Sequence, residues 1–377
     1  MLDVKTMGES EIDEMYAKLC TQIDSQSFGF AHNTSVPGIS LIKRLFTPEQ
    51  AAYILEIPVS EFFTALDYAN MIGVTEEEAE ELLHDLSMHG LCFRTVRDGQ
   101  KLYRSYPMIP GLIEPNAPRI ADEPGIGQDL IAAFQDGWMP KVFETGIPFL
   151  RAIPIDKNLV ADGLISDDDD IDQILSKRRR FAAAKCTCRL STRACGLPET
   201  GLRDDTCIQT DEWADYYIDN GVARDVSREE ARAIIQDSID KGACIEICNS
   251  QNSEIICCCQ KDTCAILMNQ QLFPIDDNLR QMSNYRVQRD PELCSDCGTC
   301  VDVCVTKSTK RLDDGSIEVA DNCYGCGQCV KNCSTGARSL VQKPAGVYVP
   351  FSDRPVGVFD TYLEIEAFRR AEGDLKE

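Results

Sequence analysis

Apolar and polar positions recur with helical spacing in the first third of the chain. Thr47 is followed by a proline and, three positions later, by Gln50, which is the pattern of a capping box at a helix start. Thr75 and Glu78 make a second capping box, and Ser60 is a further candidate helix start. The apolar residues after the second box follow the i, i+3, i+4, i+7 rule of an amphipathic helix: Ala79, Leu82, Leu83 and Leu86.

A two-stranded hairpin is predicted directly after these helices. Gly90 is placed to end the last of them. Residues 91–96 and 101–106 then flank Asp98-Gly99, a strong signal for a tight hairpin turn. Three short helices followed by a two-stranded wing predict a winged helix-turn-helix.

The charge of this region argues against DNA binding. Residues 40–106 hold six Lys or Arg against eleven Asp or Glu, and the expected recognition helix opens with Glu76-Glu77-Glu78. Phosphates would repel such a helix. The whole chain has 38 basic and 62 acidic residues, a formal net charge of −24. We therefore expect no nucleic-acid partner, and a docking or structural role for the region.

Composition and capping signals indicate the nature of the next segments. Residues 107–125 are rich in Pro and Gly and are expected to form a linker. Four acids at 167–170 and four bases at 177–180 fit one helix whose charges complement its dipole. Ser227 and Glu230 make a third capping box within the helical-looking stretch 211–243. A mostly helical middle region follows from these signals.

The chain has twenty cysteines, and eighteen of them lie between 186 and 333. Disulfide scaffolds of this density are usually small and secreted. This chain has 377 residues, starts without an apolar signal segment and contains no run of about 18 apolar residues. The pattern indicates a cytoplasmic protein without membrane insertion, whose clustered cysteines serve metal or redox chemistry.

The strongest motif is the spacing C-x2-C-x2-C-x3-C, which occurs twice. In this bacterial two-cluster ferredoxin motif, the fourth cysteine of each run ligates the other cluster. The predicted ligands of one [4Fe–4S] cluster are therefore Cys294, Cys297, Cys300 and Cys333. Those of the second cluster are Cys323, Cys326, Cys329 and Cys304. Val305 and Ser334 stand where the motif usually has proline, so the motif does not indicate the reduction potential of either cluster.

Ten more cysteines between 186 and 264 indicate a further metal centre. Packing alone does not explain cysteine at this density. An additional [4Fe–4S] cluster is the expected occupant, with zinc or a redox-active thiol group as the alternatives. The candidate ligands are Cys186, Cys188, Cys195, Cys207, Cys257, Cys258, Cys259 and Cys264.

The order of these features resembles the 4Fe–4S dicluster-domain proteins of anaerobic bacteria and archaea. The resemblance covers roughly residues 40–340 and rests on Cys186-Thr187-Cys188-Arg189, the cysteine tract 257–264 and the two ferredoxin runs. Relatives have a longer cysteine run at 257–264, and Cys244 and Cys248 look like additions. The resemblance implies electron-transfer service to a larger redox enzyme.

Together these signals predict an α+β multidomain protein. The expected parts are a winged-helix-like domain (1–110), a linker and helical segment (111–180), a Cys-rich, mostly helical middle domain (181–284), a ferredoxin-like (βαβ)2 domain (285–345) and a C-terminal tail (346–377).

The leading hypothesis for function is an electron-transfer subunit without catalytic residues of its own. It would pass single electrons through two [4Fe–4S] clusters, and a third in the middle region, to or from a larger redox enzyme or flavoprotein subunit. Two alternatives stay open. One is a redox-sensing winged-helix regulator, and the other is an oxidoreductase that uses a metal centre in the middle region.

Overall fold

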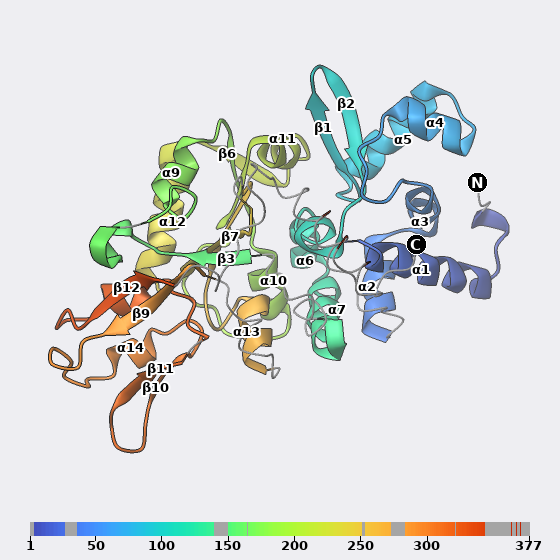
Figure 1. Cartoon of the computed structure of the whole chain (residues 1–377). Coiled ribbons are helices and arrows are strands. Elements are labelled where there is room, and N and C mark those ends of the chain that lie inside the picture. Colours follow the sequence, from blue (N-terminus) through green and yellow to red (C-terminus); the bar gives the residue numbers. More distant parts are fainter. Residues whose placement is uncertain are drawn as a thin grey trace.

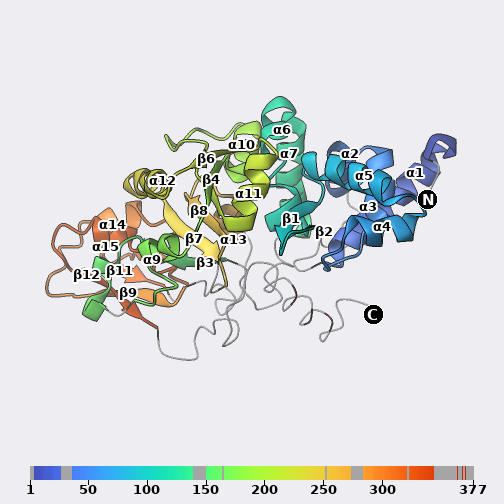
Figure 2. The ribbon, with the colours of Figure 1, turned by 90° about the horizontal axis from the view of Figure 1, so that it is seen from above.

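The computed structural model describes residues 4–26, 36–138, 150–163, 165–250, 253–272, 283–320 and 322–343, with the single residues 363, 367 and 370. In Figures 1 and 2, the N-terminal helices and the C-terminal strands lie at opposite ends, with the middle region between them. Nearly all of the expected tail 346–377 lies outside the described residues.

The N-terminal part consists of helices followed by a hairpin. They are α1 (Glu9–Asp24), α2 (Val36–Leu45), α3 (Pro48–Leu55), α4 (Ala65–Ile72), α5 (Glu76–Met88), β1 (Phe93–Arg97) and β2 (Gln100–Arg104), preceded by the turn η1 (Val4–Thr6). The capping boxes at Thr47 and Thr75 are present, and Asp98 and Gly99 both have the positive φ of a tight hairpin turn. These local predictions are confirmed.

The predicted helix start at Ser60 is wrong. Helix α4 begins at Ala65, because the Thr64 hydroxyl accepts a hydrogen bond from the Asp67 amide at 3.1 Å. Ser60 instead has a left-handed backbone with φ of 65°. The serine at this position marks a turn, and the competing threonine four residues later provides the cap.

The hairpin packs against helix α11 (Asp211–Asp219) of the middle region. The rings of Phe93 and Trp213 lie 5.0 Å apart, and the Tyr216 hydroxyl donates to the carbonyls of Ser87 and Cys92 at 3.0 and 3.1 Å. The carboxylates at the start of α5 are exposed. The hairpin therefore packs against another part of the same chain.

Residues 107–125 do not form the expected linker. Met108, Ile109, Leu112 and Ile120 are buried, because the segment lines the interior where the N-terminal helices meet the middle region. It contains the turn η2 (Met108–Leu112), helix α6 (Ala117–Asp122) and the start of α7 (Pro124–Ala133), which is followed by η3 (Phe134–Trp138). Helix α7 contacts both α2 and α10 (Thr187–Ala194). The prolines and glycines of residues 107–125 therefore belong to a packed segment and not to a linker.

A six-stranded antiparallel sheet forms the middle region, so the prediction of a mostly helical region is wrong. The strand order is β3-β7-β8-β5-β4-β6. The strands are β3 (Leu150–Ile153), β4 (Phe181–Ala184), β5 (Cys207–Thr210), β6 (Ala223–Val226), β7 (Cys244–Cys248) and β8 (Ile255–Cys259). Most are four or five buried residues long, so they lack the polar alternation that identifies a half-exposed strand.

Helices α10, α11, α12 (Arg228–Asp240), α13 (Ala265–Leu272) and the short α9 (Ile171–Ser176) accompany the sheet, with turns η4 (Lys157–Leu159) and η5 (Ala161–Gly163). The predicted helix across 167–180 is wrong in extent, because Asp170 caps α9 and the chain leaves the helix at Lys177. The bases that follow pair with carboxylates of the same region; Arg178, for example, lies 3.2 Å from Asp211.

The C-terminal part repeats a strand–helix–strand order twice. It contains β9 (Tyr285–Arg289), α14 (Thr299–Asp302), β10 (Thr309–Arg311), β11 (Ile317–Val319), α15 (Gln328–Lys331) and β12 (Arg338–Gln342). Strands β9 and β12 pair antiparallel, as do β10 and β11. This arrangement brings the two cysteine runs next to each other, because α14 and α15 are in contact.

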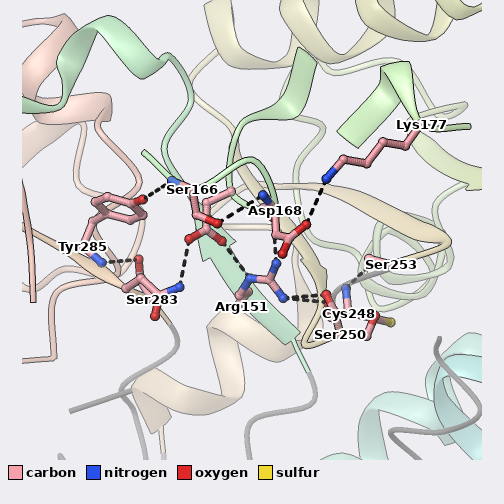
Figure 3. Close-up of polar contacts among 11 residues, drawn as sticks. Arg151, Ser166, Asp168, Lys177, Cys248, Ser250, Ser253, Ser283 and Tyr285 are labelled. Atoms are coloured by element: carbon pink, nitrogen blue, oxygen red, sulfur yellow. Dashed lines mark hydrogen bonds and ion pairs between the residues drawn. The ribbon is translucent and has the colours of Figure 1, made fainter. Parts of the chain in front are cut away.

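A buried ion pair of the middle region, between Arg151 and Asp169, lies at the contact with the C-terminal part (Figure 3). Arg151 of β3 donates to the Asp169 carboxylate at 2.9 Å, to the Ser250 carbonyl at 2.8 Å and to the Asp168 carbonyl at 2.7 Å. The side chain of Asn284, just before β9, also donates to Asp169 at 2.8 Å. The guanidinium therefore fixes the edge of the sheet relative to the C-terminal part.

Among the described helices, none is both long and apolar enough to cross a membrane.

Candidate metal centres

The outer cysteine set consists of Cys294, Cys297, Cys300 and Cys333. Cys297 is exposed, Cys300 is buried, and the other two are half-buried. Burial raises the pKa of Cys300, and the nearby thiols of Cys297 and Cys294 raise it further. Cys333 lies two residues after the end of α15, and α15 contacts α14. Its assignment as the fourth ligand stays a prediction.

The inner cysteine set consists of Cys304, Cys323, Cys326 and Cys329. Burial raises the pKa of Cys326 well above its usual value, and the charges of the other three thiols raise it further. Burial likewise raises the pKa of Cys329 to about 12, with Cys323 and Cys304 adding to the effect. The thiol of Cys304 is therefore within electrostatic range of Cys326 and Cys329. The crossed ligand pattern stays a prediction.

The backbone around both sets has features that suit a cluster. Gly298 and Gly327 each precede the third cysteine of their run with φ of 93°, a conformation that favours glycine. The Thr309 and Gly325 amides donate to the sulfurs of Cys304 and Cys323, each at 3.4 Å. Donors aimed at ligand sulfur tune the potential of a bound cluster. Donor chemistry and backbone together fit [4Fe–4S] clusters.

We predict that Gly325→Ala empties the inner set. A Cβ at Gly325 would collide with the Tyr285 carbonyl group, at a φ of +56°. The loop that carries Cys323 and Cys326 would have to move, and iron per chain should fall by about four, the content of one cubane cluster. Gly336→Ala is the matched control, since it also has a positive φ of +68° but has open space around it. Equal iron loss in both variants would contradict the prediction.

Seven of the eight predicted middle cysteines line one cavity of about 70 Å³. That volume holds roughly five water-sized spheres. We call it the thiol cavity; its cysteines come from the start of α10, from β5, from β8 and from the turn after β8: Cys186, Cys188, Cys207, Cys257, Cys258, Cys259 and Cys264. Cys195, the eighth candidate, lies exposed at the end of α10 and is not in the lining.

Six of these thiols lie close enough together to shift one another's pKa values. They are Cys186, Cys188, Cys264, Cys259, Cys257 and Cys207. Donation from Cys207 and Cys259 holds the pKa of Cys257 well below its usual value. Donation from Cys188 and Cys259 lowers the pKa of Cys264 to about 6. The neighbouring thiols therefore favour deprotonation of Cys257 and Cys264, and the thiolate is the form that binds metals.

Three ionisable residues beside the cavity were not predicted from the sequence: Arg189, Glu114 and Glu246. Burial alone would lower the pKa of Arg189, but the surrounding thiols raise it, so a cation stands among them. Desolvation raises the pKa of Glu114 to about 7 and that of Glu246 to about 8. The sequence held one usable signal, because Glu246 interrupts an otherwise apolar strand.

In the part of the chain that the structure describes, no group of three or more His, Cys, Asp or Glu residues is arranged to hold a metal ion. The thiol cavity instead offers a row of sulfurs along two strands and a helix start. The donor set itself is suited to soft metals, since thiolates bind zinc and iron–sulfur clusters.

Comparison with known proteins supports an iron–sulfur domain in the C-terminal part. Residues 286–334 match the family described as 4Fe-4S dicluster domain. The chain is also 36% identical over 62 residues to a tetrathionate reductase subunit of Archaeoglobus fulgidus. That similarity covers 16% of this chain and 30% of the relative's length. No solved structure matches the chain.

Proposed function

We propose that the chain is an electron-transfer subunit of a larger redox complex. The outer and inner cysteine sets would each hold a [4Fe–4S] cluster, with the crossed ligands named above. The observation that carries this proposal is the match of residues 286–334, which hold both cysteine runs, to the 4Fe-4S dicluster domain. Similarity to a reductase subunit supports membership in an enzyme complex.

We further propose that the thiol cavity holds an additional [4Fe–4S] cluster. A cubane cluster needs four thiolate ligands, and the six neighbouring thiols of the cavity exceed that number. Such a cluster supplies one-electron storage. Within this chain, Arg189 would offset its negative charge, and the apolar lining of Ile109, Ile113 and Phe134 would limit its exposure to water.

The N-terminal helices and hairpin are proposed to form a winged-helix domain, and the C-terminal part a ferredoxin-like domain, within the boundaries predicted above. The wing is packed on α11, which supports a structural role. A second candidate function is an oxidoreductase whose reaction takes place at the thiol cavity, favoured by the thiols and the Glu114 side chain that line it.

Iron and acid-labile sulfide per chain, with EPR of the reduced protein, test the proposal. About twelve irons are expected for three cubanes. Cys297→Ala should remove about four of them and the signal of one cluster, whereas Glu77→Ala, at an exposed helix position, should remove none. Unchanged iron in Cys297→Ala would refute the ligand assignment, and zinc in place of iron would refute the cluster assignment.

A further inference from the structure

We infer that the thiol cavity is the inner end of an electron path, with the inner set as the obligatory step between it and the outer set. The inference rests on the proposed function, because it requires clusters in the two ferredoxin sets and a redox centre in the cavity. It adds the order of the centres: electrons exchange with a partner at the outer set and reach the cavity only through the inner set.

The exposure of the cysteines indicates which set a partner would reach first. Cys297 of the outer set is exposed, and Leu293, next to Cys294 of the same set, is 53% exposed. In the inner set, Cys326 is half-buried and packs against the main hydrophobic core, which also contains Cys259 and Cys264. A protein partner can therefore approach the outer set at Cys297, whereas no cysteine of the inner set is exposed and Cys326 packs against the core.

The C-terminal part touches the middle region at the inner cysteines. Gln328, between Cys326 and Cys329, is buried and donates to the carbonyls of Ala243 at 2.7 Å and Ile239 at 2.8 Å. The Ile155 amide donates to the carbonyl of Cys326 at 2.9 Å. These contacts hold the inner set against the end of α12 and the start of β7, and β7 pairs with β8, whose cysteines line the cavity.

Cys244 lies at the junction itself. It is fully buried, and its thiol donates to the Cys259 carbonyl at 3.5 Å. It pairs with Cys259 in the β7–β8 register. Its thiol is also within electrostatic range of both Cys326 and Cys264. Cys244 therefore lies near the inner set as well as near the lining of the cavity.

The proposed step moves one electron and nothing else. The reduced inner cluster loses one electron and becomes oxidised, and the oxidised centre in the cavity gains that electron. No bond forms or breaks, and no proton is transferred. The electron enters the chain from a one-electron reductant at the outer set, for which dithionite serves as the probe.

Magnetic interaction between centres tests this order. In dithionite-reduced protein, EPR should show coupling between the signals of the cavity centre and the inner cluster. Cys323→Ala, which removes an inner ligand, should abolish that coupling, whereas Cys297→Ala, which removes an outer ligand, should leave it intact. Coupling that disappears with the outer cluster, or is absent when all centres are reduced, would overturn the inference.

Cys244→Ala tests the junction without removing a proposed ligand. Iron per chain should stay unchanged, while reduction of the cavity centre, followed by rapid-freeze EPR, should become several-fold slower. Cys248→Ala is the matched control, because Cys248 is a buried cysteine at the other end of β7. Equal rates in the two variants, or iron loss in Cys244→Ala, would overturn the role of Cys244. Iron near eight in the unaltered protein, the content of two cubanes, would instead refute the third cluster.

Discussion

Replacing Cys257 and Cys264 together by serine should remove the cavity centre and leave the two ferredoxin clusters in place. Among the thiols that line the cavity, these two have pKa values that neighbouring thiols lower. Serine keeps the volume and a hydroxyl but is a poor ligand for a soft metal. Iron should fall from about twelve to about eight per chain.

Cys195→Ser provides the matched control for this double variant. Cys195 belongs to the same cysteine-rich region, but it is exposed and lies outside the cavity lining. Its replacement should leave the iron content and every EPR signal unchanged. Iron loss in Cys195→Ser, or full iron in the double variant, would show that the centre is built elsewhere.

Among the substitutions proposed, Arg151→Met should lower the free energy of unfolding most. The side chains of Arg151 and Asp169 are only 5% and 3% exposed. Removing the guanidinium leaves the Asp169 carboxylate buried without its main cationic partner, and breaking a buried ion pair costs about 3–5 kcal/mol. Chemical denaturation followed by tryptophan fluorescence measures the change, since Trp138 and Trp213 are both buried.

The control for this prediction is an exposed pair with similar geometry. Arg203 lies 2.6 Å from Asp205, and their side chains are 42% and 26% exposed. Arg203→Met should cost at most about 1 kcal/mol, because solvent screens such pairs. If both methionine variants lose the same free energy of unfolding, the network around Arg151 does not hold the two parts of the chain together.

Local signals in the sequence were sufficient where the structure depends on neighbours along the chain. The capping boxes at Thr47 and Thr75 and the turn at Asp98-Gly99 are present as expected. A capping box closes within four residues and a tight turn within two, so no distant contact is needed to form them. The spacing of the ferredoxin cysteines is a signal of the same local kind.

Predictions failed where a fold-wide contact decided the outcome. The segment 107–125 has the composition of a linker but is buried under α7 and α10. The middle strands were missed because strands buried on both faces show no alternation, and their partners lie far along the chain.

The sequence by itself determined the chemistry of this protein: an iron–sulfur domain with two cysteine runs, and a further stretch rich in thiols. Tertiary structure alone decided which thiols meet. Sheet pairing sets Cys207 opposite Cys257 and Cys244 opposite Cys259, and it leaves Cys195 in solvent. The physical reason is that metal and redox sites form from side chains that converge in space, and antiparallel pairing of distant strands sets that convergence.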